Sequence, residues 1–417
     1  MATEANYPSH LELKLVQILH RHGHRTALRQ RLPGLIPPIW TRCFESNVLM
    51  HNFLTKSLEG NSNEDTHSIN HPSYEKKGKQ ANINFVVPTF GNVFRLVYEK
   101  NNNDLAKAAS GTCYLGQLTD DGRRAMRGFG GNLRDLYVNQ LGFLPSTFHP
   151  SSVYLRSTEY ARTIESVQCL FSGLYPQATL PITLNIRKEQ DETMFPSGRC
   201  PRLKQLEMEF RESFLRDYSD RISSIKKKLN GLFQVPDEFG NYPSIHGLFD
   251  SVYCAKEHKI SENIVTNEDM KELEKLSAAE WYTVFKKSKE AVRLGIGRLV
   301  NEIAINIQSK IKGLSKDLKL IVFSGHDTSI APLLAAFDVL GDEWPPFASN
   351  IILELFEEKQ SPNKHHVRLI FNGNYMKMPA CKSTIDERPE LCPINEFLEM
   401  CEKLTPKNYT LECTTRQ

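Results

Sequence analysis

Three apolar segments that end in charged or imidazole side chains constrain the fold of this 417-residue chain most strongly. The first is LKLVQILHRHGHR at 13–25, where an apolar run meets Arg21, His22 and Arg25. Such a run predicts a short strand that is buried on both faces, and Gly23 allows a sharp turn just after it. Two arginines beside a histidine do not suit a core, because guanidinium keeps its charge and must face an anion or water. The segment therefore predicts an anion pocket at the end of a strand.

The same design occurs twice more along the chain. A strand predicted at Val153–Leu155 leads into Arg156, and a strand predicted at Leu318–Phe323 leads into His326 and Asp327. A segment with helical periodicity follows each of them, and strands that alternate with helices indicate an α/β fold with a doubly wound, mainly parallel sheet. Ligands bind at the carboxyl ends of the strands in such sheets. We therefore expect these side chains to converge on one site.

Two long stretches interrupt this alternation and are interpreted as insertions in a single folded unit. Residues 31–112 are polar and poor in periodicity, and residues 191–292 are charged and helical in pattern. The α/β core is accordingly expected at about 11–30, 113–190 and 293–417. The second insertion is expected to be mostly helical.

Charge and hydropathy exclude two classes of protein. The 52 basic and 49 acidic residues give a net charge of only +3, which lacks the basic field that nucleic-acid binding needs. The sequence contains no apolar run of about 20 residues, so no transmembrane segment is expected. The oligomeric state is left open by the sequence.

The compartment is less well defined by the sequence. Its first residues lack the pattern of a secretory signal, which favours the cytoplasm as the sequence stands, with mitochondria, or the secretory pathway after removal of a leader, as alternatives. The nine cysteines form no CxxC pair, but four of them lie between Cys381 and Cys413. That crowding suits a disulfide in an oxidising compartment, and Cys381 and Cys392 are the nearest pair.

The side chains at the three strand ends fit phosphoryl transfer. This reaction needs an in-line nucleophile, positive donors around the phosphoryl oxygens and an acid for the leaving oxygen. A neutral imidazole can attack phosphorus, guanidinium forks match phosphate oxygens, and a carboxyl group can protonate the departing alkoxide. The expected catalytic residues are His22 and Asp327, and the expected phosphate-binding residues are Arg21, Arg25, Arg156 and His326.

The motifs RHGHR at Arg21–Arg25, RST at Arg156–Thr158 and HD at His326–Asp327 resemble those of the histidine acid phosphatases, the branch of the histidine phosphatase superfamily that includes phytases. The resemblance extends from Leu13 to about Cys413. It implies an α/β core with a largely helical cap over the pocket, which the insertions at 31–112 and 191–292 would form. It also implies a phosphohistidine formed on His22 and proton donation by Asp327. It also implies hydrolysis of phosphate monoesters without a metal or other cofactor, with lysophosphatidic acid among the candidate substrates.

Several alternatives remain beside this interpretation. His20, His22 and His24 alternate as zinc ligands can, but neighbouring arginines would repel a cation. Arg162 suits a structural ion pair at least as well as a ligand contact and is not included in the site. A sugar-phosphate or phytase-like phosphatase is the nearest alternative function, and a phosphoglycerate mutase or a silent phosphate-binding scaffold is further removed. An apolar groove at the pocket would favour a lysophospholipid, and a basic bowl would favour inositol polyphosphates.

Overall fold

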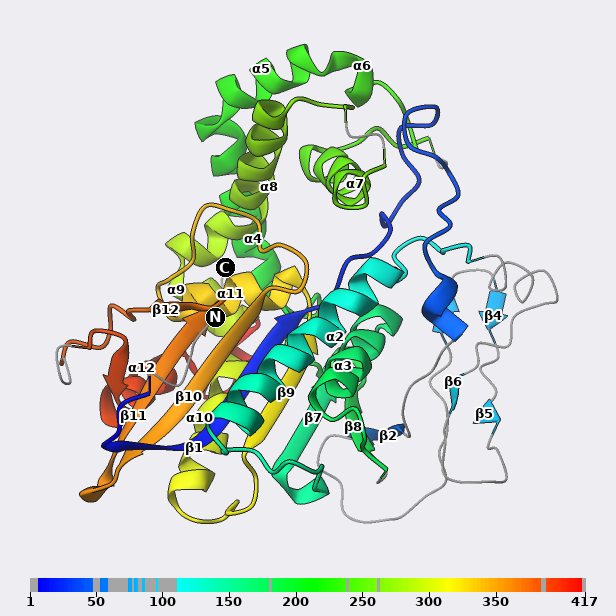
Figure 1. Cartoon of the computed structure of the whole chain (residues 1–417). Coiled ribbons are helices and arrows are strands. Elements are labelled where there is room, and N and C mark those ends of the chain that lie inside the picture. Colours follow the sequence, from blue (N-terminus) through cyan, green and yellow to red (C-terminus); the bar gives the residue numbers. More distant parts are fainter. Residues whose placement is uncertain are drawn as a thin grey trace.

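The computed structural model is organised around one mixed β-sheet with helices on both faces (Figure 1). The structure describes residues 7–47, 53–58, 74–76, 79–81, 85–86, 95–96, 111–179, 182–237, 240–260, 263–383 and 388–414. The strands follow the order β12 (Asn374–Met376), β11 (Ser361–Phe371), β10 (Asn350–Glu358), β1 (Leu11–Arg21), β9 (Leu320–Gly325), β7 (Val153–Ser157), β8 (Ile182–Arg187) and β2 (Phe53–Leu58), and β13 (Leu391–Pro393) pairs with β11.

The central strands are parallel, as the sequence predicts. Strands β1, β9, β7, β8 and β2 run in the same direction, whereas β10, β11, β12 and β13 are antiparallel to their neighbours. Arg21 at the end of β1 pairs in register with Gly325 of β9, and Ser157 of β7 pairs with Ser324. The three predicted strand ends therefore meet at one edge of the sheet.

Alternating apolar residues give the sheet two buried faces. Val16, Ile18 and Val322 pack toward α2 (Asp120–Arg134) and α3 (Ala161–Leu174). The strand residues that alternate with these point to the other face. They belong to a second apolar cluster with α10 (Gly297–Ile311), α11 (Asp327–Ala336) and α12 (Ile394–Leu404). Because successive side chains of a strand point to opposite faces, this alternation produces the doubly wound layers seen in Figure 1.

Helices α2 and α3 approach each other at glycines. A Cβ atom on Gly130 would lie 1.9 Å from the carbonyl oxygen of Leu170, and one on Gly173 would lie 2.0 Å from the carbonyl oxygen of Arg127. These contacts leave no room for a side chain at either position. The two glycines therefore set the distance between the helices that cover this face of the sheet.

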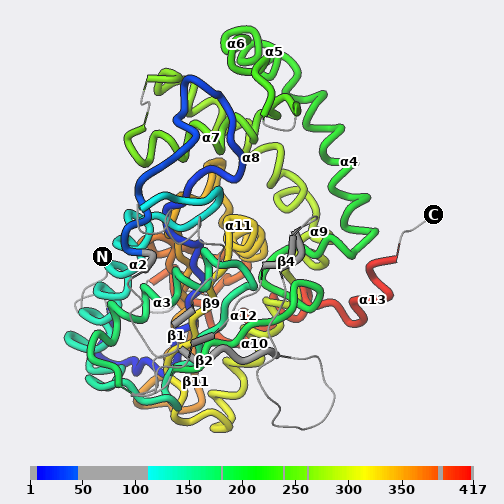
Figure 2. Tube along the Cα trace, turned by 90° about the vertical axis from the view of Figure 1, so that its right-hand side faces the viewer, coloured from blue at the N-terminus to red at the C-terminus, as the bar shows by residue number. Residues whose placement is uncertain are grey.

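A helical cap lies over the edge of the sheet where the parallel strands end (Figures 1 and 2). Its helices are α4 (Pro201–Asp217), α5 (Ser219–Lys228), α6 (Asn230–Phe233), α7 (Ile245–Glu257), α8 (Asn267–Lys287) and α9 (Lys289–Gly295). They occupy most of the segment that the sequence predicts as a helical insertion. None of the helices in the described part of the chain is long and apolar enough to cross a membrane.

The first insertion differs in part from its prediction. Its strand β2 pairs in parallel with β8, so these residues extend the core sheet instead of leaving it. Two short hairpins are also formed, β3 (Tyr74–Lys76) with β4 (Lys79–Ala81) and β5 (Phe85–Val86) with β6 (Arg95–Leu96). Backbone pairing along an edge strand adds hydrogen bonds without requiring the apolar periodicity that identifies a buried strand. The sequence pattern therefore gave no indication of β2.

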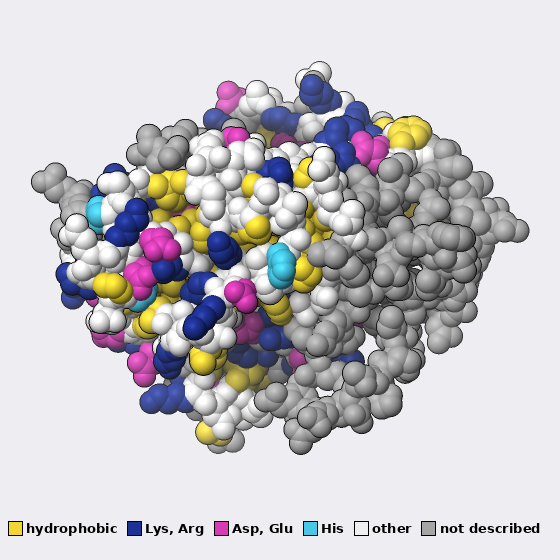
Figure 3. All heavy atoms as spheres, turned by 60° about the horizontal axis from the view of Figure 1, so that its bottom comes forward, with side chains coloured by type: hydrophobic (Ala, Val, Ile, Leu, Met, Phe, Trp, Pro, Cys, Tyr) yellow, Lys and Arg dark blue, Asp and Glu magenta, His cyan; other side chains and the backbone are white. Residues whose placement is uncertain are grey.

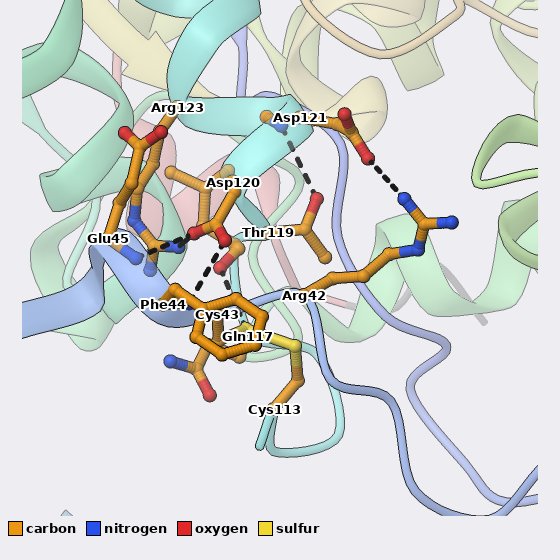
Figure 4. A network of polar contacts seen from close by, with 12 residues as sticks. Arg42, Cys43, Phe44, Glu45, Cys113, Gln117, Thr119, Asp120, Asp121 and Arg123 are labelled. Atoms are coloured by element: carbon orange, nitrogen blue, oxygen red, sulfur yellow. Dashed lines mark hydrogen bonds and ion pairs between the residues drawn. A yellow bond between two sulfur atoms is a disulfide. The ribbon is translucent and has the colours of Figure 1, made fainter. Parts of the chain in front are cut away.

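The two ends of this insertion are held together beside α2 (Figure 4). Cys43 and Cys113 form a disulfide, and the carboxylate of Asp120 accepts hydrogen bonds from the backbone amides of Phe44 and Glu45. Asp120 also forms an ion pair of 2.8 Å with Arg123. The covalent link and the buried carboxylate fix where the insertion leaves and rejoins the core.

Two further disulfides tie down the C-terminal part of the chain. Cys381 is bonded to Cys392, which confirms the expected nearest pair, and Cys413 is bonded to Cys200 at the start of α4. The second bond joins residues 213 positions apart, so it links the cap to the end of the chain. Cys169, Cys254 and Cys401 are buried free thiols.

Candidate active site

A pocket of about 190 Å³ lies where β1 and β9 end and α11 begins. Four of the six predicted site residues line it, namely His22, Arg25, His326 and Asp327. The remaining lining residues are Leu28, Tyr160, Arg162, Phe195, His246, Trp281, Thr328 and Trp344. The side chains predicted at the ends of β1 and β9 therefore converge, whereas Arg156 at the end of β7 does not line the pocket, and cap residues complete it.

His22 is held as a neutral imidazole. It is 1% exposed, and its Nδ1 lies 2.9 Å from the carbonyl oxygen of Gly23. A carbonyl oxygen can only accept a hydrogen bond, so Nδ1 carries the proton and the lone pair is on Nε2. Burial, followed by the charges of Arg162, Arg21 and Arg25, holds the pKa of His22 well below its usual value. The imidazole therefore keeps its lone pair in mildly acidic solution.

Two arginines of the first motif are fixed by carboxylates on different elements. Arg21 Nη2 lies 2.8 Å from Oδ2 of Asp327, and Arg25 Nη2 lies 2.8 Å from Oδ1 of Asp250 on α7. Both guanidinium groups also lie over the ring of Phe347, at 4.3 and 5.7 Å from its centroid. Arg25 lines the pocket, and Arg21 lies beside it through its contact with Asp327. The Arg25–Asp250 pair also joins the core to the cap.

Asp327 is the first residue of α11 and is ionised in the free protein. Its Oδ2 is 3.3 Å from Nε1 of Trp344, and its Oδ1 accepts a hydrogen bond of 2.8 Å from the amide of Thr328. Burial raises the pKa of Asp327, but the charges of Arg21 and Arg25 outweigh this effect and lower the pKa to about 2. The carboxylate is therefore held in place by positive charges that an incoming anion would share.

His326 is oriented by two neighbours that the sequence did not identify as site residues. Its Nδ1 is 3.4 Å from Nη2 of Arg162, and its Nε2 is 3.0 Å from Oγ1 of Thr158. Arginine can only donate, so Nδ1 is the acceptor and the proton is on Nε2. Burial and then the charge of Arg162 hold the pKa of His326 well below its usual value. His326 is thus a neutral side chain in the wall of the pocket.

The structure does not bring Arg156 into the pocket, and this corrects its expected position. Arg156 is fully buried and donates hydrogen bonds to Glu192 and Glu302, and to Oγ1 of Thr193 at 2.7 Å. Glu302 lies on α10, on the opposite side of β7 from α3. The side chain of Arg156 therefore belongs to an ion-pair cluster with Glu192 and Glu302, outside the pocket.

Arg162 lines the pocket in its place, which sequence reasoning missed. It lies in the first turn of α3, which follows β7 along the chain. The signal that could have identified it is its place at the start of the helix after β7, where anions are favoured. The adjacent RST motif drew the prediction to Arg156 instead.

The other two histidines of the first motif have separate surroundings. His20 is fully buried, and its ring centroid lies 6.5 Å from that of Phe129. His24 pairs with Glu257 of α7 at 3.3 Å. Among the described residues, no group of three His, Cys, Asp or Glu side chains is arranged to hold a metal ion.

A larger hollow of about 980 Å³ lies at the opposite end of the sheet, on the face shown in Figure 3. Four of its five lysines bind groups within the chain: Lys310 donates to the carbonyl oxygen of Leu318, Lys319 to that of Phe143 and Lys359 to that of Ser9, and Lys14 pairs with Glu357. Positive and negative side chains are mixed over this face in Figure 3. The small pocket at the strand ends is therefore the better candidate for chemistry.

Comparison with known proteins assigns the family. The model of the histidine phosphatase superfamily (branch 2) matches residues 12–372. A probable acid phosphatase of Schizosaccharomyces pombe is 27% identical, and the match covers 98% of this chain and 95% of the relative. The chain belongs to branch 2 of the histidine phosphatase superfamily.

Other relatives show how broad this family is. Human lysophosphatidic acid phosphatase type 6 is 24% identical over 98% of this chain and 87% of its own length. The segments GQLT and WPPFA at Trp344–Ala348 led us to expect this protein as the nearest relative, but its 24% identity is below the 27% of the yeast relative. The apo structure of Hafnia alvei phytase superimposes with a TM-score of 0.63 at 15% identity, covering 99% of this chain and all of the phytase. This last likeness concerns the fold alone.

The different positions of Arg156 and Arg162 predict different consequences of mutation. Arg156→Ala removes the cation that pairs with the buried carboxylate of Glu192, which should lower the free energy of unfolding by about 3–5 kcal/mol. Arg162→Ala removes a side chain from the pocket wall and should cost clearly less. Urea unfolding of both variants measures the difference, and equal losses would contradict the placement of Arg156.

Proposed function

We propose that the chain hydrolyses phosphate monoesters through a phosphohistidine formed on His22. The observation that carries this proposal is a buried neutral imidazole, fixed by Gly23 and surrounded by guanidinium groups. A neutral lone pair is the form that attacks phosphorus, and the arginines supply charge where the phosphoryl oxygens would lie. The acid phosphatases among the relatives support the same reaction class.

The reaction has two steps. In the first, His22 Nε2 forms a bond to phosphorus, the ester P–O bond breaks, and the leaving alkoxide takes a proton from Asp327. In the second, water attacks phosphorus, the P–N bond breaks, and Asp327 takes the proton that water loses. The products are the alcohol and inorganic phosphate, and both steps use only side chains of this chain.

The surrounding charges give Asp327 its role as acid. In the free protein Arg21 and Arg25 keep its carboxylate ionised. A bound phosphate group shares those positive charges and adds negative charge beside Asp327, which raises the pKa of the carboxyl group. The substrate monoanion can therefore deliver the proton that Asp327 later gives to the leaving oxygen.

Phosphate binding is assigned to the arginines. His326, which the sequence predicts as a phosphate ligand, is assigned instead to orienting Arg162, because its Nδ1 lone pair faces Arg162 and its Nε2 proton faces Thr158. Arg25 and Arg162 line the pocket, Arg21 lies against Asp327, and Nδ1 of His326 lies beside Arg162. Guanidinium forks match phosphate oxygens in both geometry and charge. Arg162 takes the place that the sequence gave to Arg156.

The reacting groups themselves distinguish this enzyme from a silent phosphate-binding scaffold. His22→Ala should abolish turnover of p-nitrophenyl phosphate in the presence of a chelator, because the variant lacks the imidazole that attacks phosphorus in the proposed mechanism. Asp327→Asn should slow esters with poor leaving groups far more than p-nitrophenyl phosphate, since nitrophenolate departs without a proton. Steady-state rates on both esters test this. Equal slowing would remove Asp327 from the acid's role, and full activity of His22→Ala would refute the proposal.

The lowered pKa of His22 predicts that the acidic side of the pH–rate profile shows no loss of activity from protonation of this histidine near pH 6.5. An ordinary histidine gains a proton below about pH 6.5, and a nucleophile of that kind would lose its lone pair. Because burial and three arginines keep the pKa of His22 lower, kcat/KM for p-nitrophenyl phosphate should not fall between about pH 7 and pH 5. A pH profile measures it, and a decrease that follows protonation near pH 6.5 would contradict the environment assigned to His22.

We also propose that the protein works in an oxidising compartment. The support is the presence of three disulfides among its nine cysteines, since cytosolic proteins rarely keep such bonds. This favours the secretory alternative over the cytoplasm. Alkylation of protein taken from its native cells and denatured without reductant should label only Cys169, Cys254 and Cys401. Labelling of all nine cysteines would favour the cytoplasm.

A further inference from the structure

The walls of the pocket beyond the reacting groups are aromatic. On the side of α3 and the segment after β8, Tyr160 and Phe195 lie with ring centroids 4.9 and 6.0 Å from that of His326. On the side of the cap, the ring of His246 lies 4.7 Å from Trp281 and 4.7 Å from Trp344. A ligand that enters between α3 and the cap therefore meets rings on both sides.

The mouth of the pocket is apolar as well. Leu28 is 47% exposed and Trp281 is 43% exposed, and both line the pocket. Exposed large apolar side chains have an unfavourable contact with water that a ligand can remove. Their position at the entrance to a buried site indicates a surface that an apolar group covers on binding.

The charges at the pocket suit a single phosphate group. Arg25, Arg162 and Asp327 are the charged side chains that line it in the described part of the chain, and no lysine is among the lining residues there. Burial lowers the pKa of His246, so the cap wall is uncharged near neutral pH. Several phosphate groups on one molecule would meet this wall without cations, and an unpaired anion against an apolar surface loses its hydration without compensation.

We propose that the substrates of this pocket are monoesters with one phosphate group and an apolar leaving group that packs between Trp281, Trp344 and Leu28. This inference rests on the proposed phosphatase function and defines its substrate class. It excludes inositol polyphosphates as substrates of this pocket, although phytases share its fold. Trp281 is then a specificity-determining residue that touches the leaving group and not the phosphate.

Matched pairs of esters test the proposal without changing the reaction. Benzyl and ethyl phosphate have alcohol leaving groups of similar acidity, so their kcat/KM ratio reports packing of the ring. The wild type should prefer benzyl phosphate by at least about tenfold, since apolar groups of this size discriminate to that degree. Lysophosphatidic acid and glycerol 3-phosphate form a second pair, which tests whether an acyl chain packs against the same aromatic wall. Phytate is the polyphosphate substrate in the comparison.

Trp281→Ala should reduce the preference for benzyl over ethyl phosphate about tenfold, because the variant loses one aromatic face. Tyr242→Ala is the matched control, since Tyr242 is a 67% exposed aromatic residue that does not line the pocket. It should leave the ratio unchanged. Trp281→Phe should restore most of the preference, which a general disturbance of the cap would not allow.

The outcomes separate this inference from the function on which it rests. Equal use of benzyl and ethyl phosphate, or efficient hydrolysis of phytate, would overturn the substrate class while leaving the phosphatase proposal intact. An unchanged ratio in Trp281→Ala would overturn the role of Trp281. A lack of hydrolysis with every ester would instead count against the proposed function.

Binding of a non-hydrolysable ligand provides a readout that does not depend on turnover. Two of the three tryptophans of the chain, Trp281 and Trp344, line the pocket, and the third, Trp40, is buried beside His258. Benzylphosphonate should change the intrinsic fluorescence at concentrations at least about tenfold lower than ethylphosphonate. Equal midpoints for the two phosphonates would contradict an apolar leaving-group site even if the chain hydrolysed no ester.

Discussion

The ion pair between Arg21 and Asp327 joins the two elements on which the site depends. Arg21 is the last residue of β1 and Asp327 is the first residue of α11, and their side chains lie 2.8 Å apart where β1 and β9 end in register. The parallel pairing of these strands places His22 and His326 beside each other, with ring centroids 5.6 Å apart. The sheet thus sets the positions of these side chains, and the charge of Arg21 keeps Asp327 ionised.

Burial and nearby charge act together on the pKa of His22 but oppose each other on the pKa of Asp327. Burial together with nearby arginines lowers the pKa of His22, whereas for Asp327 the arginines oppose and outweigh the effect of burial. One set of guanidinium groups therefore produces both an uncharged nucleophile and an ionised carboxylate. A bound phosphate would offset these positive charges, so the same arginines that attract the substrate also couple its arrival to protonation of Asp327.

The sequence predicted the parts of this arrangement that depend on local pattern. The apolar runs that end in His22 and in His326–Asp327 identified two strands and their common edge, since buried parallel strands are apolar along their length. The sequence did not distinguish Arg156 from Arg162, because the direction of each side chain depends on the strand pleat and on carboxylates distant in sequence, such as Glu302. The residues that the cap adds, His246 and Trp281 among them, were equally hidden, since their position follows from tertiary packing.

The cap explains how one fold can take different substrates. In the proposed mechanism the core supplies the nucleophile, the acid and the phosphate ligands. Asp250 on α7 holds Arg25 from the cap side at 2.8 Å. The aromatic wall formed by His246, Trp281 and Trp344 comes from the cap and from the loop after α11. Changes in these segments alter the leaving-group side of the pocket without moving the strand ends. The division agrees with the general finding that function is set by sites that a fold supports and not by the fold itself.

The most direct test of this account is to trap the intermediate. Wild-type protein mixed rapidly with p-nitrophenyl phosphate, quenched in alkaline denaturant and digested should yield a peptide with one phosphoryl group on the imidazole of His22, and His22→Ala should yield none. A phosphoryl group on another residue, or turnover with no phosphorylated peptide at any quench time, would contradict a phosphohistidine mechanism centred on His22.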